Sequence, residues 1–161
     1  MILCDNSIVN KIESEEIYVD PLPTPKQIQP ASLDVRLGRK VYDPKIDRVV
    51  DHHEHILLPG KRYLGTTQEV VELPNDIAAQ LAGRSSVGRQ GVIVHKTAGW
   101  IDPGFRGEIT LELMNLGDEP VELGAGDRVA QLVFFPLNAS SEGYDGSYQL
   151  QTGPTKSKLN D

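Results

Sequence analysis

The chain has 161 residues, a length typical of one domain that buries its own core without disulfides or a structural metal. A content of 39% apolar and 24% charged residues indicates a globular protein. The formal net charge of −7 argues against a general nucleic-acid binder, because such a protein needs a basic face. Cys4 is the single cysteine, which excludes internal disulfides and cysteine-rich zinc sites.

The same features bear on location. One cysteine fits a reducing compartment. No apolar run reaches the roughly 18 residues of a transmembrane helix. Residues Met1–Ile12 lack the basic start and long apolar stretch of a signal peptide. We therefore expect a cytoplasmic protein that contacts neither membrane nor nucleic acid.

The N-terminal segment predicts a short helix. Apolar residues between Asp5 and Ile17 are spaced as one face of a helix, and Asp5 or Ser7 could cap it. Four prolines between Asp20 and Pro30 then predict an extended connector without regular structure.

The pattern after this connector is that of short strands. Ser32–Leu37 and Glu108–Met114 alternate apolar with polar residues, and Val129–Phe135 is apolar on both faces, as in a strand covered on both sides. Only Asn75–Leu81 and Ser85–Gln90 predict further helical turns. Short strands separated by frequent Gly and Pro turns indicate a sandwich, a jelly roll or a barrel.

The C-terminal segment differs in composition. From Asn138 the chain is rich in Ser, Gly, Thr and Asn and has no apolar period. Such a segment buries too little apolar surface to order by itself, so we expect it to be mobile and to order only on a ligand. The sequence thus predicts one domain over residues 1–161, with 138–161 as a flexible tail.

The segment from Gly83 to Ser86 could bind phosphate. A strand-to-helix turn at this point would offer backbone N–H groups, two hydroxyls and the Arg84 guanidinium, a set that suits a di- or triphosphate. The alternative is a serine helix cap beside an arginine in a surface ion pair. Arg89 lies about one helical turn further and could point at the same ligand.

Two carboxylates are candidates for hydrolytic chemistry. Glu112 lies on the polar face of its predicted strand, where a solvated glutamate is the alternative. The catalytic interpretation requires that face to be covered, most simply by a neighbouring subunit. Asp102 precedes Pro103-Gly104 and could equally initiate a turn.

The histidine-rich segment His52–His55 does not indicate a metal site. Adjacent residues of a strand point to opposite faces, and neither a zinc-binding helix motif nor a cysteine pair accompanies them. A solvated loop is the better interpretation, and we expect no zinc.

Five segments together resemble the motifs of the dCTP deaminase/dUTPase family, in the family's order. These are Gln29–Gly38, Gly83–Arg89, Thr97–Glu112, Gly126–Leu132 and Tyr144–Pro154. Each motif alone is weak, whereas five in register over most of the chain are specific. The resemblance implies an all-β, jelly-roll-like distorted β-barrel of the trimeric dUTPase type with a short N-terminal helix. It also implies a homotrimer with active sites between subunits.

The resemblance further implies a substrate site. Its residues would be Arg84, Ser85, Ser86, Val87, Gly88, Arg89, Thr97, Ala98, Gly99, Trp100, Asp102, Phe105, Thr110, Leu111, Glu112, Gln131, Tyr144 and Gln151. The catalytic members would be Glu112, Asp102, Arg89 and Ser85.

The implied roles follow position by position. Arg84, Ser85 and Ser86 would bind the triphosphate, aided by Tyr144 and Gln151 of the tail. Residues 97–100 would recognise the pyrimidine, largely through backbone groups, and Asp102 would hold the 3′-hydroxyl of the deoxyribose. Glu112 would be the general base, while Arg89 and Ser85 place the water and the base. Mg²⁺ would be held through the triphosphate, with no protein ligands of its own.

The implied reaction is the hydrolytic deamination of dCTP to dUTP and ammonia. Zinc deaminases activate water with a metal held by a His/Cys signature that this sequence lacks, so a carboxylate that moves the protons is the metal-free route. A dUTPase that only cleaves phosphates has no need of Glu112. Ala98-Gly99 resembles the bifunctional branch that carries dUTP on to dUMP and pyrophosphate, in which Asp102 would also orient the attacking water.

Three alternatives remain open. The chain could be a dUTPase without deaminase activity, a catalytically inactive nucleotide-sensing trimer, or an unrelated β-sandwich interaction module. dTTP could act as an inhibitor of the enzyme.

The sequence departs from the family's pattern at two positions and in one motif. Ser147 replaces a lysine that usually binds phosphate, for which Lys156 or Lys158 could compensate, and Phe105 replaces a tyrosine or tryptophan. The Gly-rich fifth motif of dUTPases is absent, which weighs against a dUTPase-only function.

Overall fold

The computed structural model describes residues 1–159, which form a mostly β-stranded molecule. In chain order its elements are α1 (Asp5–Glu13), β1 (Tyr18–Asp20), η1 (Pro25–Gln27), β2 (Ile28–Gln29), β3 (Ser32–Arg36), β4 (Lys40–Asp43), β5 (Arg48–Asp51), β6 (Glu54–Leu57), β7 (Arg62–Glu72), β8 (Ile77–Gly83), α2 (Ser85–Gly88), β9 (Val92–Ile93), β10 (Trp100–Ile101), β11 (Arg106–Asn115), β12 (Val121–Gly124) and β13 (Arg128–Pro136).

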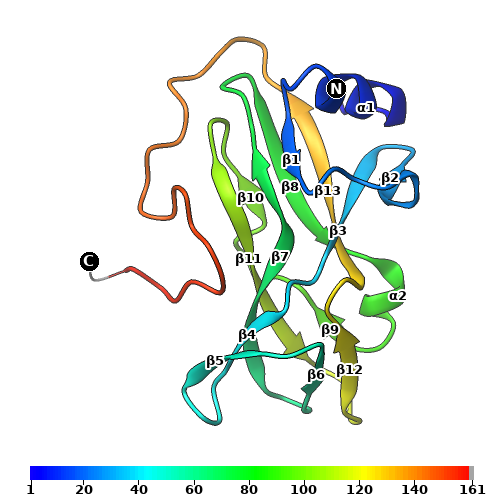
Figure 1. Cartoon of the computed structure of the whole chain (residues 1–161), viewed down its shortest axis with the longest axis vertical. Helices are drawn as coiled ribbons and strands as arrows, with labels where there is room; N and C mark the ends of the chain where they lie inside the picture. Colours follow the sequence, from blue (N-terminus) through cyan, green and yellow to red (C-terminus); the bar gives the residue numbers. More distant parts are fainter. Residues whose placement is uncertain (160–161) are drawn as a thin grey trace.

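Two large sheets and one two-stranded sheet make up the barrel (Figure 1). The first sheet has the order β5-β4-β7-β11-β9, with β1 also paired to β7. The second has the order β10-β8-β13-β3-β2, and β12 pairs with β6. The pairs between these strands are antiparallel, and most neighbours are not consecutive in the chain. This is the jelly-roll-like, distorted β-barrel that was expected.

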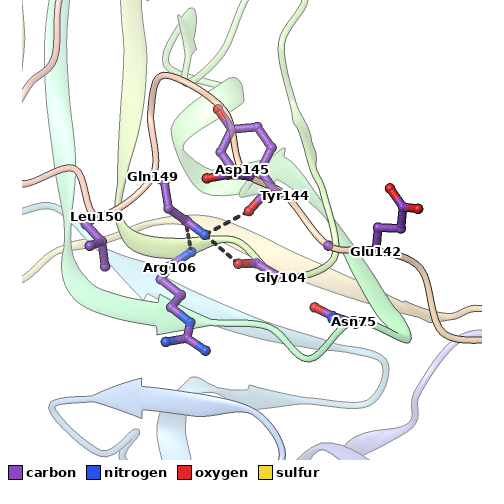
Figure 2. A pocket seen from close by; sticks show the side chains of 9 residues that line it. Asn75, Gly104, Arg106, Glu142, Tyr144, Asp145, Gln149 and Leu150 are labelled. Carbon is purple, nitrogen blue, oxygen red and sulfur yellow. Dashed lines mark hydrogen bonds between the residues drawn. The ribbon is translucent and has the colours of Figure 1, made fainter.

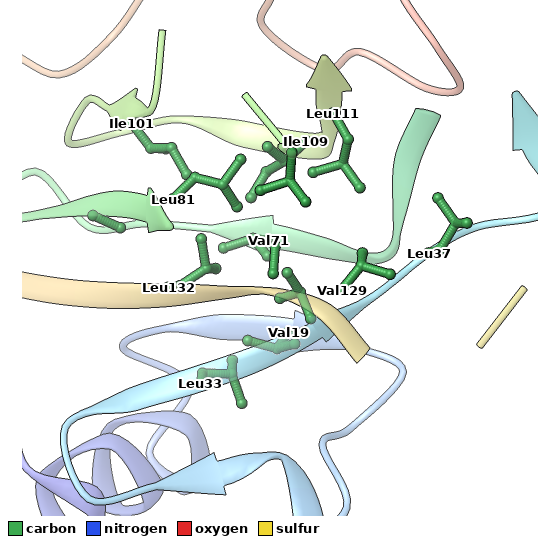
Figure 3. Close-up of a cluster of buried hydrophobic side chains, with 14 of the residues drawn as sticks. Val19, Leu33, Leu37, Val71, Leu81, Ile101, Ile109, Leu111, Val129 and Leu132 are labelled. Carbon is green, nitrogen blue, oxygen red and sulfur yellow. The ribbon is translucent and has the colours of Figure 1, made fainter. Parts of the chain in front are cut away.

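The core lies between the inner faces of these sheets (Figure 3). On β11 the residues Ile109, Leu111 and Leu113 are buried, while Thr110 and Glu112 point to the opposite, partly exposed face. The alternation along Glu108–Met114 therefore predicted both the strand and its buried side correctly, because successive side chains of a strand face opposite ways.

The strand β13 is covered less evenly than expected. One face, with Ala130, Leu132 and Phe134, is fully buried, whereas Val133 and Phe135 on the other face are only half-buried. In the single chain, this outer face therefore keeps part of its apolar surface accessible.

Two predictions of helical turns had opposite outcomes. Ser85–Gly88 forms α2, as expected. The helical turn expected over Asn75–Leu81 is wrong, because Ile77–Gly83 is the strand β8, paired along its length with β13. Non-local pairing overrides the local preference of this segment.

The N-terminal part needs two smaller corrections. The helix α1 ends at Glu13, and its cap position is Cys4 rather than Asp5 or Ser7. The connector after Asp20 is not free of regular structure, since it contains η1 and the short strand β2. Over residues 1–159, neither helix has the length and apolar character needed to cross a membrane.

The tail packs along one side of the barrel. It leaves β13, passes over the end of the molecule and descends along the side that carries β10 and β11 (Figure 1). Its contacts with β11 begin with backbone hydrogen bonds from Leu150 N–H to Arg106 O, 2.7 Å, and from Glu108 N–H to Gln151 O, 3.0 Å. Mobility of this segment stays a prediction.

Candidate functional site

A cavity of about 680 Å³ lies between β7, β10, β11 and the tail. Of the residues expected at the substrate site, those in its lining are Ala98, Trp100, Asp102, Phe105, Thr110, Glu112, Tyr144 and Gln151. We call these eight residues the pocket group. Six of the eight lie between Ala98 and Glu112, and the fold brings the more distant Tyr144 and Gln151 of the tail to them.

Glu112 faces this cavity from the outer face of β11. One carboxylate oxygen, Oε2, accepts a hydrogen bond from the backbone N–H of Lys96 at 2.9 Å. This bond ties the carboxylate to the hairpin just before Ala98 and orients it toward the cavity. Glu112 is half-buried, and residues of the tail line the same cavity.

The hairpin that leads into β11 is tightly packed at Gly99. A Cβ at this position would lie 2.8 Å from Cε1 of His95 and 2.9 Å from the carbonyl oxygen of Leu81. The Leu81 N–H also donates to Gly99 O at 2.7 Å. Only a glycine fits here without moving the His95 ring, so the small residue of the Ala98-Gly99 pair has a steric reason.

The turn between β10 and β11 carries Asp102 and Phe105. Phe105 is buried, and its ring lies 6.2 Å from that of Tyr144 in the tail. Asp102 is exposed and lines the cavity, and its carbonyl accepts a hydrogen bond from Phe105 N–H at 3.2 Å. Asp102 thus both begins a turn and presents its carboxylate to the cavity, so the two interpretations are compatible.

The middle of the tail is hydrogen-bonded to this turn through Gln149 (Figure 2). The Gln149 amide donates to Gly104 O at 2.8 Å and to Tyr144 O at 3.0 Å, and its oxygen accepts from Arg106 N–H at 2.8 Å. A smaller cavity of about 280 Å³ opens beside these residues. One glutamine side chain therefore joins the tail to the start of β11.

The expected phosphate-binding residues form a second cluster, which we call the α2 group: Arg84, Ser85, Ser86, Val87, Gly88, Arg89 and Gln131. Ser85, Ser86 and Arg89 are exposed, whereas Val87 is buried and anchors the short helix. Gln131 on β13 donates to Gly83 O at 3.3 Å and accepts from the Ser32 hydroxyl at 2.9 Å.

Arg84 is held by a buried carboxylate. Its Nε lies 3.0 Å from Oδ2 of Asp34, and a second guanidinium, that of Arg128, approaches the same oxygen at 3.1 Å. Arg84 also donates to the Arg128 carbonyl at 2.9 Å. Burial raises the pKa of Asp34 although both arginines oppose that rise. These contacts give Arg84 a defined orientation.

The structure does not bring the two groups together within one chain. No member of the α2 group is among the residues that line the 680 Å³ cavity in the described part of the chain. Thr97 and Gly99 flank the cavity without lining it, and Leu111 is fully buried on the core side of β11. Any contact of Leu111 with a substrate would have to come from its backbone.

Several lining residues were not anticipated from the sequence. Arg62 and Leu64 enter from β7, where Leu64 pairs with Glu112 across the strands. Tyr42, Lys96 and Tyr148 are further polar residues of the lining. Tyr42, Arg62 and Leu64 lie outside the five segments that resemble family motifs, and the registers of β4 with β7 and of β7 with β11 bring Tyr42 and Leu64 to Glu112.

The comparisons with known proteins agree with this fold. The fold is shared with the dUTPase of EIAV, which superposes with a TM-score of 0.58 over 83% of this chain and 99% of that chain at 18% identity. A 2′-deoxycytidine 5′-triphosphate deaminase from Agrobacterium tumefaciens superposes with a TM-score of 0.72 at 26% identity, over 83% of this chain and 47% of that one. The chain thus spans about half the length of that deaminase, and its class is that of the dUTPase-like β-barrels.

The sequence comparisons identify the family within this fold class. The dCTP deaminase-like family model matches residues 2–137, and the chain belongs to this family. A dCTP deaminase of Natronomonas pharaonis is 42% identical over 99% of this chain and 95% of that protein. A "dCTP deaminase, dUMP-forming" of Dictyoglomus turgidum is 43% identical with the same coverage.

Proposed function

We propose that the chain deaminates dCTP to dUTP and ammonia, and continues to dUMP and pyrophosphate at the same site. One observation carries the proposal. Glu112 and Asp102 line one cavity together with Ala98 and Trp100 of the hairpin. The relatives named as dUMP-forming dCTP deaminases support the same activity.

Glu112 is suited to the first step. Its Oε2 is held by Lys96 N–H, which leaves the other carboxylate oxygen for a water molecule in the cavity. Glu112 removes a proton from that water as the oxygen bonds to C4 of cytosine. The C4–N4 bond then breaks as the amino nitrogen receives a proton and departs as ammonia, leaving a C4 carbonyl. Atoms balance as dCTP plus water giving dUTP plus ammonia.

Asp102 is suited to a second hydrolysis. Its side chain lines the cavity, and it takes no part in the hydrogen bond between Lys96 N–H and Glu112. It would hold the 3′-hydroxyl of the sugar and orient a water toward the α-phosphate, so that cleavage releases pyrophosphate. This role rests on the resemblance and on the position of the side chain.

Mg²⁺ fits this site as an ion carried by the substrate. Within residues 1–159, no three or more His, Cys, Asp or Glu side chains gather in a way that could hold a metal. The ion's ligands would therefore be phosphate oxygens and water, an arrangement that Mg²⁺ favours. When bound, the ion would neutralise charge on the triphosphate, while Glu112 and Asp102 position the waters.

The active enzyme is proposed to be a homotrimer with sites between subunits. The separation of the α2 group from the pocket group supports this, because a neighbour could supply Arg84 and Ser85 to a cavity that lacks them. The outer face of β13 supports it as well. Trp100, 54% exposed, packs 5.7 Å from Phe135, and half-buried Val133 extends this apolar surface.

The proposal extends to ligands and location. dTTP would compete as an inhibitor, because it presents the same triphosphate and deoxyribose to the same groups. No nucleic acid or membrane is needed as a partner. Cys4 is a free, exposed thiol, which fits a reducing cytoplasm.

A product assay tests the activity. The protein is incubated with dCTP and Mg²⁺ while ammonia, dUTP, dUMP and pyrophosphate are followed over time. Ammonia with dUMP and pyrophosphate is the expected result. If ammonia forms while dUTP accumulates, the protein does not carry out the proposed hydrolysis of dUTP to dUMP. If dUTP is converted to dUMP but dCTP releases no ammonia, the protein is a dUTPase. Binding of dCTP without any product would identify an inactive nucleotide-sensing trimer.

A further inference from the structure

Lys156, near the end of the tail, places an ammonium group at the wall of the 680 Å³ cavity. Its Nζ lies 3.0 Å from Oδ1 of Asp47 and 4.3 Å from the centre of the Tyr42 ring. The Tyr42 hydroxyl donates to the same Asp47 oxygen at 2.7 Å. A residue of the β4–β5 turn thus holds a cation of the tail beside the proposed substrate site.

We infer that Lys156 is a phosphate-binding residue of this cavity, and that Asp47 holds its ammonium group until a nucleoside triphosphate replaces the carboxylate. This inference rests on the proposed function and identifies one cation that binds the phosphates of its substrate. An ammonium offers three hydrogen-bond donors on a flexible stem, which suits it to phosphate oxygens.

The ion pair with Asp47 is easily exchanged. The side chains of Lys156 and Asp47 are 60% and 78% exposed, and ion pairs at such exposure contribute little to stability. A triphosphate carries several negative charges and many acceptor oxygens, so it competes well with one carboxylate. Lys156 can therefore leave Asp47 at low cost when the cavity fills.

The other lysine of the tail is occupied differently. The ammonium of Lys158 donates to the backbone carbonyl of Ser147 at 2.6 Å and lies 5.7 Å from the Tyr148 ring. It is not among the residues that line the cavity. Of the two lysines that could compensate for the uncharged Ser147, the geometry therefore selects Lys156.

The charges of the cavity agree with an anionic ligand. Two carboxylates, Asp102 and Glu112, line it from the β10–β11 turn and from β11, whereas Arg62, Lys96 and Lys156 bring three cations. Counting Asp47, which pairs with Lys156, the charges at this wall balance, whereas the protein as a whole carries a formal charge of −7. Removing Lys156 would leave this wall with a net negative charge.

Calorimetric titration of dCTP and dCMP tests the inference, with Glu112→Gln as the background so that dCTP stays intact. Adding Lys156→Ala should raise the Kd for dCTP about five- to tenfold, because a partly exposed charge-assisted contact with phosphate is lost. The Kd for dCMP should change much less. Lys156→Arg should keep most of the affinity, since it retains the charge.

Matched variants separate phosphate binding from other effects. Asp47→Asn breaks the same ion pair but keeps the cation, and should leave the dCTP affinity equal or higher. Lys11→Ala removes a lysine from another surface pair, with Glu16 at 2.6 Å, and should have no effect. A loss in Asp47→Asn equal to that in Lys156→Ala would show that Lys156 only seats the tail, and overturn the inference.

Two further outcomes would also overturn it: equal losses in Lys156→Ala and Lys158→Ala, or no change in Lys156→Ala. Failure of the proposed function is a separate result. It would show as no ammonia from dCTP with the unsubstituted protein, whichever way the binding series turns out.

Discussion

Glu112 carries the deamination proposal because it is the carboxylate of β11 that both faces the cavity and is oriented by a backbone N–H. In Glu112→Gln the amide keeps the shape of the side chain but cannot take a proton. Ammonia release from dCTP should fall about 10²- to 10⁴-fold, the usual contribution of a general base. Coupled ammonia detection measures the rate, and calorimetry should find the dCTP affinity nearly unchanged.

Glu122→Gln is the control for that experiment, because Glu122 is an exposed glutamate on β12 outside the cavity lining. It should deaminate dCTP at the unsubstituted rate. If Glu112→Gln lost affinity in proportion to its loss of rate, Glu112 would be a binding residue and the general-base role would be wrong.

Gly99 is the second residue at which a substitution should have a specific effect. Gly99→Ala would place a methyl group 2.8 Å from the His95 ring and 2.9 Å from Leu81 O, so the hairpin must shift. Overpacking of this kind costs about 1–3 kcal/mol of stability. Thermal unfolding should show the loss, and the ratio of dUMP to dUTP from dCTP should fall as Ala98 and Asp102 are displaced.

Gly88→Ala is the matched control, because Gly88 has open space around the same hypothetical methyl group. Its unfolding temperature should change much less. An unchanged unfolding temperature in Gly99→Ala would mean that His95 moves freely and that the hairpin tolerates bulk.

Among the elements, β11 was predictable and β8 was not. Alternation along β11 is a local signal, and it correctly predicted that Glu112 lies opposite Leu111 and Leu113. The strand β8 is imposed by pairing with β13, which a local pattern cannot reveal. The contacts of the tail with the turn before β11 and with β11 also have no signature in the sequence. They use backbone groups and the Gln149 amide, and such contacts leave no apolar period.

The attachment of the tail to the β4–β5 turn should depend on pH. Hydrogen bonds from Tyr42 and then from Lys156 lower the pKa of Asp47 below its ordinary value. The charged form is thus favoured in the folded chain. This contribution is fully present above the ordinary aspartate pKa of about 3.9, and is lost as the pH falls through the lowered value. The contact should therefore be constant from neutral pH down to about pH 4.

NMR checks this by following the Thr155 and Lys156 amide signals as the pH is lowered from 7 to 3. They should shift only below about pH 4, together with the Asp47 carboxylate. In Asp47→Asn the same signals should lack that transition. A transition with the same midpoint in Asp47→Asn would assign it to another carboxylate, such as Glu108, which accepts from Gly153 N–H.

In the whole molecule, α2 and the 680 Å³ cavity lie apart within one chain, because no residue of α2 lines that cavity. Sequence motifs predicted that Arg84 and Glu112 serve one site, yet one chain places Arg84 on Asp34, on β3, while Glu112 faces the cavity beside the tail. A sequence motif does not indicate which copy of the chain supplies its residues to a given site. The two placements agree if neighbouring subunits complete each other's sites, as proposed above.

Mixed trimers test this directly. Glu112→Gln and Arg84→Ala should each be inactive alone. If the site lies between subunits, random reassembly of equal amounts yields mixed trimers in which one site of the three has both residues intact, so about a quarter of the unsubstituted activity should return. Ammonia release from dCTP measures the recovery, with the trimer mass checked by light scattering.

The pair Glu112→Gln and Asp102→Asn gives the control, because both residues line the same cavity of one chain. No mixed trimer of these two variants contains an intact site, so no activity should return. Recovery in the first mixture and none in the second would place Arg84 and Glu112 on different subunits. No recovery in either, with all variants trimeric, would mean that one chain brings its own Arg84 to Glu112. That outcome would require a rearrangement of α2 that the ion pair with Asp34 opposes.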